Sequence, residues 1–452
     1  MKRATTTTTT TSASKKSSSS IGGGGGGGIT TTTKRRGGST KGIPLFAYLA
    51  ILPLLGVIFM IFDIISSHSS SPTSPDSSSS SSLRTPKQTN SKQKEVVPNT
   101  STHGKVPNGV HEDSNSPPQT TIFVKSTGMT LPSATTLLTK SPPYNDDDII
   151  YLSGSKDTMI SYSPNTVVTA YYRIPSKFKP SKYSGWMKNM LSLQDPMIIF
   201  TSQDLISTIE ELRNHATNRT VIIPLELNDL PIATLYTTEF WKQQLERDPE
   251  KRIHQSYELF WIWLSKTWWV NEAIRLNVYQ SDLFMWSDIG CFRNSQYNDK
   301  TMIIHRNQIP KTEMIQMAHH VPNPPTDVIY YNDKYSKVNK PHFYHSGSQM
   351  AAYKDTWIRF HELFLIIIDE FLIRNMIIVE DQAILQSVCL KTPTICAYVP
   401  FDQVKPNDNH YFGLRYVVHV GGKKYNLWRQ SVDASKVAAE KQVEYDIKNK
   451  LL

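Results

Sequence analysis

Hydrophobic and polar positions are distributed unevenly along the 452 residues. Up to about residue 147 the chain is dominated by Thr, Gly and Ser runs, and its one long apolar stretch is 43–65. Beyond residue 147, short apolar runs alternate with stretches whose apolar residues recur at three- and four-residue steps. Apolar runs are typical of buried strands, and the second spacing is typical of amphipathic helices. The pattern therefore predicts one large folded domain over 148–428.

The first elements of that domain alternate between strand and helix. Apolar runs predict strands at 166–172, 197–200 and 220–223, with helices at 182–193 and 204–215 between them. This alternation predicts an α/β fold with a mostly parallel sheet and helices on both faces. The later expected elements are long helices at 255–278 and 349–374, a strand at 301–305, a helix at 309–325, a strand at 376–379 and a charged helix or tail at 429–452.

The apolar stretch 43–65 is long enough to cross a bilayer as a helix. Basic residues cluster just before it, and the first one after it is Arg84. The positive-inside bias therefore predicts a single-pass type II signal anchor with the folded domain outside the cytosol. We expect 1–42 to be a disordered basic cytosolic tail and 66–147 a disordered stem. Two sequons, at Asn99 and Asn218, are compatible with N-glycosylation on that side.

Charge limits the classes of partner, and cysteine content limits the number of disulfides. The formal net charge is +10, but eight basic residues precede Ile43, where there are no acids, so the rest is close to neutral. A near-neutral domain gives no electrostatic argument for nucleic acid as a partner. The three cysteines allow at most one internal disulfide, for which Cys389 and Cys396 are the plausible pair.

Candidate chemistry lies in two acidic loops that each follow a short apolar run. Asp288 ends the run Leu283–Trp286, and Glu380 and Asp381 end the run 376–379. Ligands of open α/β sheets bind outside the carboxyl ends of the strands, where we expect these acids to converge. Carboxylates there can hold a hard cation or remove a proton from a hydroxyl group. The alternative is that each acid only caps the following helix.

Four motifs carry a resemblance to a known family. They are VVTAYYRI at 167–174, DPMIIFT at 195–201, SKTWWVNEAI at 265–274 and FMWSDIGCFR at 284–293. With them, residues 166–411 resemble the bacterial HtrL/YibB-like family, which is associated with surface-glycan biosynthesis. More distantly, the chain is similar to GT-A-type glycosyltransferases, and its anchor, stem and domain are similar in layout to Golgi enzymes. The resemblance implies a GT-A-like fold with a luminal domain.

The resemblance also implies roles for particular residues. Asp288 would be the metal-loop acid that meets Mn²⁺ or Mg²⁺ on a nucleotide diphosphate, although Trp286 stands where the first acid of an Asp-x-Asp would be. Either one carboxylate and waters suffice, or the enzyme works without metal. Asp381, with Glu380 beside it, would be the catalytic base or would orient the acceptor. The other implied positions are Thr169, Tyr172, Arg173, Lys266 and Arg293 for the donor, Ser346, Gly347 and Ser348 for the sugar loop, and His345, His410 or His419 as a third metal ligand.

The expected function is transfer of a sugar from a nucleotide-sugar donor to a glycan acceptor. Catalysis of this type stabilises charge on the departing diphosphate while a carboxylate activates the acceptor hydroxyl. The alternative is a catalytically inactive, membrane-anchored glycan-binding or assembly protein with the same fold, because a fold does not fix a function.

Overall fold

The structure is a computed structural model, which describes one folded domain and its C-terminal helix. The predicted segments 1–42 and 43–65 lie outside the described residues, as do Asn99, His345 and His410. Among the helices that the structure does describe, none combines the length and the apolar character that crossing a membrane requires. The described residues are 120–124, 127–175, 178–318, 346–400, 413–420, 425–429 and 431–448.

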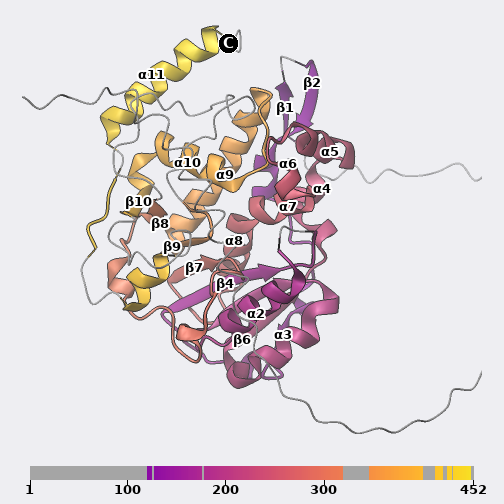
Figure 1. Cartoon of the computed structure of the whole chain (residues 1–452), viewed down its shortest axis with the longest axis vertical. Coiled ribbons are helices and arrows are strands. Elements are labelled where there is room, and N and C mark those ends of the chain that lie inside the picture. The colour runs from indigo at the N-terminus through magenta and orange to yellow at the C-terminus, as the bar shows by residue number, and fades with distance from the viewer. Residues whose placement is uncertain are drawn as a thin grey trace, which may run out of the picture. The chain divides into compact units, whose positions relative to one another are not determined.

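An eight-stranded sheet with the order β10-β8-β9-β7-β4-β5-β6-β3 forms the centre of the domain (Figure 1). The central strands β7, β4, β5 and β6 are parallel neighbours, and β10 is parallel to β8. Only β9, which is antiparallel to β7 and β8, and the edge strand β3 run against the rest. The strands are β3 (Ile150–Tyr151), β4 (Asn165–Tyr171), β5 (Met197–Thr201), β6 (Thr220–Pro224), β7 (Leu283–Ser287), β8 (Met314–Ala318), β9 (Gln349–Tyr353) and β10 (Cys396–Pro400).

Both faces of this sheet are buried, because alternate strand residues belong to different hydrophobic cores. In β4, Val168 packs into one core and Val167 into the other, and Ile198 and Ile199 of β5 divide in the same way. A strand that is buried on both faces is continuously apolar, as these runs are. The helices include α2 (Pro180–Leu191), α3 (Ile206–Arg213), α4 (Pro231–Leu235), α5 (Thr238–Arg247), α6 (Lys251–His254), α7 (Glu258–Leu264), α8 (Lys266–Leu276), α9 (Lys354–Ile373), α10 (Asp381–Lys391) and α11 (Val432–Lys448).

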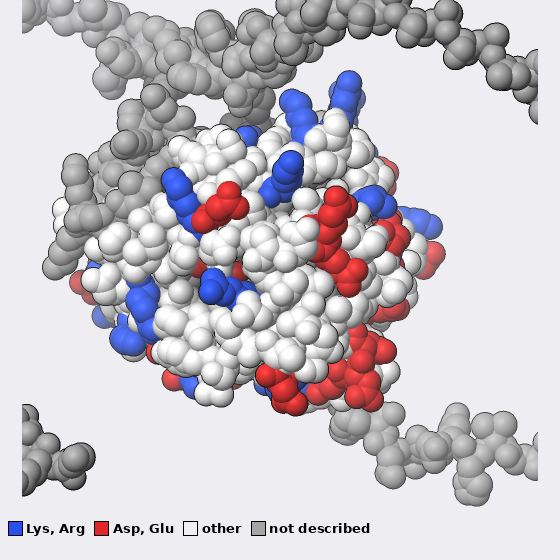
Figure 2. Space-filling model, turned by 90° about the horizontal axis from the view of Figure 1, so that it is seen from below, with Lys and Arg blue, Asp and Glu red and all other residues white. Residues whose placement is uncertain are grey.

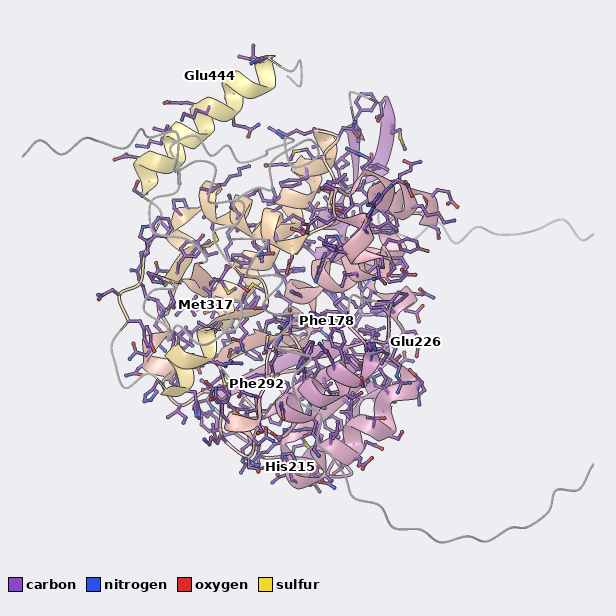
Figure 3. The ribbon with its side chains drawn as sticks, viewed as in Figure 1. Phe178, His215, Glu226, Phe292, Met317 and Glu444 are labelled. Carbon is purple, nitrogen blue, oxygen red and sulfur yellow. A yellow bond between two sulfur atoms is a disulfide. The ribbon has the colours of Figure 1, made fainter. Side chains whose placement is uncertain are left out.

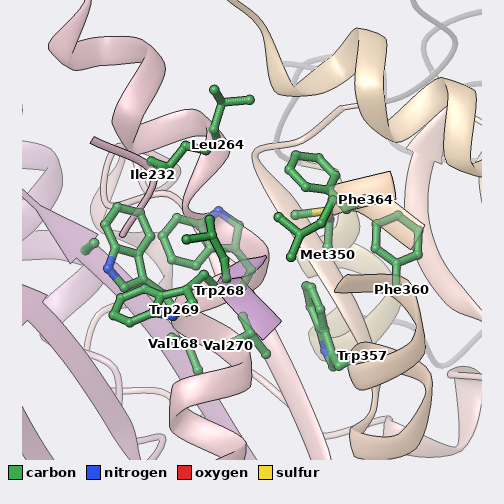
Figure 4. Packing of buried hydrophobic residues seen from close by; sticks show 14 of the residues in the cluster. Val168, Ile232, Leu264, Trp268, Trp269, Val270, Met350, Trp357, Phe360 and Phe364 are labelled. Carbon is green, nitrogen blue, oxygen red and sulfur yellow. The ribbon is translucent and has the colours of Figure 1, made fainter. Parts of the chain in front are cut away.

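The larger core is rich in aromatic side chains from α7, α8 and α9 (Figure 4). Trp269 stacks on Trp286 of β7 with ring centroids 5.3 Å apart. Trp357 of α9 donates its indole N–H to the carbonyl oxygen of Phe284 at 2.9 Å, which ties that helix to β7. The buried aromatic side chains of the segment predicted as one helix at 255–278 are therefore core residues, and a break at Ser265 divides that expected helix into α7 and α8.

The ordered domain begins earlier than the predicted boundary at residue 148. A hairpin of β1 (Thr121–Val124) and β2 (Met129–Pro132) leads into the 3₁₀ turn Ala134–Leu138, which packs on α9. Asp369 of α9 holds this turn by accepting hydrogen bonds from the Ser133 hydroxyl and, at 2.6 Å, the Ala134 N–H. The stem prediction over 66–147 is therefore wrong for this part, since a buried carboxylate more than 200 residues later in the chain holds it.

Four predictions for the second half of the domain are also wrong. The helix expected at 349–374 begins only at Lys354, because 349–353 form strand β9. Residues 301–305 form no strand. They lie in a loop, where the Asp195 carboxylate accepts hydrogen bonds from the backbone N–H groups of Met302 and Ile303. The helix expected at 309–325 contains strand β8 instead, and 376–379, expected as a strand, is not part of the sheet. Figure 2 shows the face seen from below, where acidic and basic side chains both occur and the acidic ones gather toward one side.

Candidate functional site

Two acids from distant parts of the chain meet at the ammonium group of Lys266. Asp288 directly follows β7, Lys266 is the first residue of α8, and Asp381 is the first residue of α10. The Lys266 Nζ lies 3.1 Å from Asp288 Oδ1 and 2.7 Å from Asp381 Oδ2. It also donates to the Gly347 carbonyl oxygen at 3.0 Å. We call Lys266, Asp288 and Asp381 the lysine-centred cluster.

Burial and charge pairing determine the ionisation of this cluster. The Lys266 side chain is only 4% exposed, and burial alone would lower its pKa. Asp288 and Asp381 outweigh that effect and raise the pKa of Lys266 above its ordinary value. Burial raises the pKa of Asp288, with a further contribution from Asp381, while Lys266 opposes the rise. The lysine is therefore a permanent internal cation, and Asp288 is a stronger base than an ordinary carboxylate.

Asp288 is the accessible carboxylate of the cluster. Its side chain is 33% exposed, compared with 7% for Asp381. The Trp286 indole N–H donates to Asp288 Oδ1 at 2.8 Å, and the Asp288 backbone N–H donates to the Ser348 carbonyl oxygen at 2.8 Å. The tryptophan at the position of a first Asp-x-Asp acid thus orients the acid that follows it.

The segment Ser346–Ser348 covers Asp381. Ser346 and Ser348 are buried, and their hydroxyl groups lie 2.6 Å apart. A Cβ atom at Gly347 would lie 2.3 Å from Asp381 Oδ2, so only glycine allows this close approach. The predicted sugar loop is therefore next to Asp381 and packs against its carboxylate. Asp288 is then the acid that a ligand can reach.

An aromatic patch lies beside Asp288 and was not predicted from the sequence. It consists of Phe178, Tyr183 and Trp186, whose rings contact one another edge to face. The Arg293 guanidinium lies over the Trp186 ring, 4.6 Å from its centroid. Trp186 also lies 3.4 Å from where a Cβ of Gly290 would be, so the patch adjoins the Asp288 loop. Figure 3 labels Phe178 in the middle of the domain. The spacing of Tyr183 and Trp186 places both rings on one face of a helix, and this spacing could have indicated the patch from the sequence.

The residues at the end of β4 that were expected to bind the donor do not lie at the lysine-centred cluster. Thr169 is completely buried, and Tyr172 is buried in the aromatic core, stacked on Trp269. Arg173 is exposed and pairs with Asp204 at 2.6 Å. The structure thus places Lys266 next to Asp288 and Arg293 on the aromatic patch. The other expected donor residues lie in the core or in a surface ion pair.

Glu380 belongs to a different cluster from its neighbour Asp381. His254 Nε2 lies 3.6 Å from Glu250 Oε2 and 3.7 Å from Glu380 Oε1. The other ring nitrogen, Nδ1, lies 2.5 Å from Asp248 Oδ2. We call Glu250, His254 and Glu380 the histidine-centred cluster. It is the group of three ligand-type side chains, among the described residues, that is close enough to share a metal ion.

Among the residues that the structure describes, those around Asp288 do not form a metal site of their own. Mn²⁺ and Mg²⁺ take about six ligands, most of them oxygens, and the described part of the lysine-centred cluster offers one accessible carboxylate, Asp288. Asp381 is engaged by Lys266, and Trp286 cannot bind a metal. Of the expected third ligands, His419 has its Nδ1 2.6 Å from the Thr301 carbonyl oxygen, in a structural contact.

Two further predicted features have places in the structure. A disulfide joins Cys389, near the end of α10, to Cys396 at the start of β10, and Cys291 is a buried free thiol. Asn218 is exposed in the turn before β6, where its carbonyl oxygen accepts a hydrogen bond from the Ile160 N–H.

Comparisons with known proteins identify a family and find similar solved structures. A search of curated proteins finds no match. Among solved structures, the domain is similar to the apo crystal structure of mouse xyloside xylosyltransferase 1, with 8% identity, a TM-score of 0.30, and coverage of 60% of this chain and 99% of that one. The model of a family described as "Bacterial protein of unknown function (HtrL_YibB)" matches residues 164–399, slightly more than half of the chain. This match includes Lys266, Asp288 and Asp381, and it confirms the resemblance stated from the motifs. The chain therefore belongs to the HtrL_YibB family.

Proposed function

We propose that this chain is a glycosyltransferase that moves a sugar from a nucleotide-sugar donor to a glycan hydroxyl. One observation carries the proposal: Asp288 and Asp381, which are 93 positions apart in the sequence, converge on the buried ammonium of Lys266. Asp288 lies at the carboxyl end of β7, next to the parallel strand β4, which is the edge where α/β sheets bind ligands. A GT-A-like arrangement of the fold is part of this proposal.

Asp288 is the catalytic base in this proposal, in place of Asp381. It is the more exposed carboxylate, and burial raises its pKa toward the range in which a base works near neutral pH. The acceptor hydroxyl oxygen bonds to the anomeric carbon of the donor and gives its proton to Asp288. The bond between that carbon and the phosphate oxygen breaks, and the nucleoside diphosphate leaves with the electron pair.

Lys266 and Asp381 position the base and do not touch the substrate. The Lys266 ammonium has three N–H groups and three close acceptors, namely Asp288, Asp381 and the Gly347 carbonyl. No N–H is left to donate to a phosphate, which makes the expected leaving-group role of Lys266 unfavourable. Its charge instead holds Asp288 in one orientation, and Asp381 holds the lysine.

The aromatic patch and Arg293 supply the complementary donor contacts. Phe178, Tyr183 and Trp186 are partly exposed rings beside Asp288, suited to stacking on a nucleobase or a sugar face. Arg293, which is exposed above Trp186, can offer a bidentate contact to the diphosphate. The patch therefore places an aromatic surface and a cation together beside the loop that carries Asp288.

We also propose that residues 43–65 anchor the chain as a type II membrane protein with this domain in the Golgi lumen. The exposed position of Asn218 supports this, because an acceptor asparagine must be reachable on the luminal side. Protein expressed in a secretory cell should lose mass when it is treated with an N-glycosidase. This loss of mass should be smaller in Asn218→Gln. Complete digestion of the domain by protease added to sealed vesicles would contradict the orientation.

The function is tested by offering the full chain, purified in detergent, a panel of nucleotide sugars. We expect one donor class to be hydrolysed or transferred, and the matching nucleoside diphosphate to raise the melting temperature. Binding of glycans without any nucleotide-dependent shift or turnover would favour the inactive glycan-binding alternative. Asp288→Asn should abolish turnover, whereas nucleotide binding should persist because the aromatic patch is intact.

A further inference from the structure

The histidine-centred cluster has the geometry of a metal site that is still slightly open. Its three ligand atoms all lie within 4.8 Å of one another. The two distances from His254 Nε2 to Glu250 and Glu380, 3.6 and 3.7 Å, exceed normal hydrogen bonds. Ligands about 2.1 Å from a tetrahedral Zn²⁺ are about 3.4 Å apart. A small inward movement of each side chain would therefore surround a cation.

His254 is prepared to act as a ligand through Nε2. His254 is 5% exposed, and among the described residues its Nε2 has no partner within hydrogen-bond distance. Asp248, whose side chain is fully buried, lies 2.5 Å from Nδ1, and its carboxylate favours the tautomer in which Nδ1–H donates to it. In that tautomer Nε2 carries the lone pair, on the side of the ring that the two glutamates approach. A carboxylate behind the ligating histidine is the usual support of a metal-bound imidazole.

The surroundings fix this arrangement further. Asp248 Oδ1 accepts the Glu250 backbone N–H at 2.8 Å, so one carboxylate holds both the histidine ring and the chain at Glu250. The edge of the His254 ring meets Trp263, with centroids 4.9 Å apart. Glu250 is 25% exposed, which leaves a path for a cation and a water ligand from solvent.

We propose that Glu250, His254 and Glu380 bind one divalent cation such as Zn²⁺, and that this cation joins α6 to the residue that directly precedes α10. One imidazole and two carboxylates suit Zn²⁺, and the two negative charges neutralise it. Because Glu380 is bonded to Asp381, a metal there also fixes the start of the helix that supplies the lysine-centred cluster. The site is separate from Asp288 and does not depend on the proposed transferase activity.

The test measures metal content and its structural effect on the full chain. The protein is stripped with a chelator, dialysed against Zn²⁺ and analysed by mass spectrometry for metal. We expect about one Zn²⁺ per chain and at least a 10-fold loss of affinity in Glu250→Gln. Asp248→Asn should weaken binding by about 10- to 100-fold, since it removes only the support of the imidazole. Zn²⁺ should slow amide hydrogen exchange at the start of α10.

Two matched variants control for adventitious binding. Glu246→Gln lies on the neighbouring helix α5, where the carboxylate pairs with Lys251, and should keep full metal content. His215→Ala removes an exposed histidine at the end of the domain away from α6 (Figures 1 and 3) and should also keep it. Equal Zn²⁺ binding in Glu250→Gln, or no stoichiometric metal in the wild type, would overturn the proposal in favour of a plain charge network.

Discussion

The lysine-centred and histidine-centred clusters meet at one peptide bond, between Glu380 and Asp381. They differ in how the negative charge of their carboxylates is neutralised. At Asp381 the chain supplies its own cation, Lys266, at 2.7 Å. At Glu380 the nearest imidazole nitrogen is 3.7 Å away and already has Asp248 behind its other side. The first arrangement contains a cation from the chain itself, whereas in the second the proposed metal ion would supply the positive charge. Adjacent acids can thus serve one site as a structural partner and another as a metal ligand.

The largest expected effect comes from removing the internal cation. Lys266→Met leaves Asp288 and Asp381 without their shared partner, and losing one member of a buried ion pair costs about 3–5 kcal/mol. Urea unfolding should detect this loss, and the exposed Lys188→Met control should change stability by less than about 0.5 kcal/mol. Adding Asp381→Asn should recover part of the loss. Strictly additive effects would show that the two residues do not interact in the folded protein.

A buried histidine beside the lysine-centred cluster provides a pH test. His361 lies 2.9 Å from the Thr267 hydroxyl, and burial lowers its pKa to about 4. The unfolded chain takes up the proton at about pH 6.5, so this residue stabilises the fold above pH 6.5 and loses that contribution as pH falls toward 4. We expect wild type to lose about 3 kcal/mol more than His361→Gln between these pH values. Parallel denaturation curves for the two proteins would contradict the assignment, and His215→Gln is the exposed control.

The fit of the Ser346–Ser348 segment over Asp381 is tested at Gly347. Gly347→Ala places a Cβ 2.3 Å from Asp381 Oδ2 and should destabilise the fold by about 1–3 kcal/mol. Gly185 of α2 has open space around its Cβ position, so Gly185→Ala should be neutral or stabilising by about 0.5–1 kcal/mol. Thermal melts of both variants measure the contrast. Equal effects at the two glycines would show that Asp381 is less tightly covered than the structure indicates.

The smallest effect is expected outside both clusters. Arg173 forms an exposed pair with Asp204, in which each side chain is more than half exposed. Exposed pairs of this kind contribute about 0–1 kcal/mol, so Arg173→Ala should unfold at nearly the wild-type urea concentration. Nucleotide affinity should change by less than about twofold, because the residue is not placed in the donor site. A large loss of affinity would restore the donor role that the sequence implied.

The sequence predicted the parallel centre of the sheet because β4, β5 and β6 are buried on both faces and therefore read as unbroken apolar runs. It also indicated that Asp288 and Asp381 converge, since each follows a short apolar run, although only the run before Asp288 forms a strand. Lys266 could not be placed, because nothing in SKTWWV shows that a lysine is buried at the start of a second helix. Asp248 and His254 were missed for a related reason: their partner Glu380 lies 126 positions later than His254.

The most direct test of the central claim is the transfer rate of Asp288→Asn beside a matched acid. With the donor identified from the panel, we predict at least about a 100-fold lower rate in Asp288→Asn, because the base can no longer accept the acceptor proton. Asp282→Asn, whose carboxylate is 48% exposed and pairs with Arg306, should keep the wild-type rate. A wild-type rate in Asp288→Asn, measured on protein with an unchanged melting temperature, would contradict the assignment of this site as the catalytic centre.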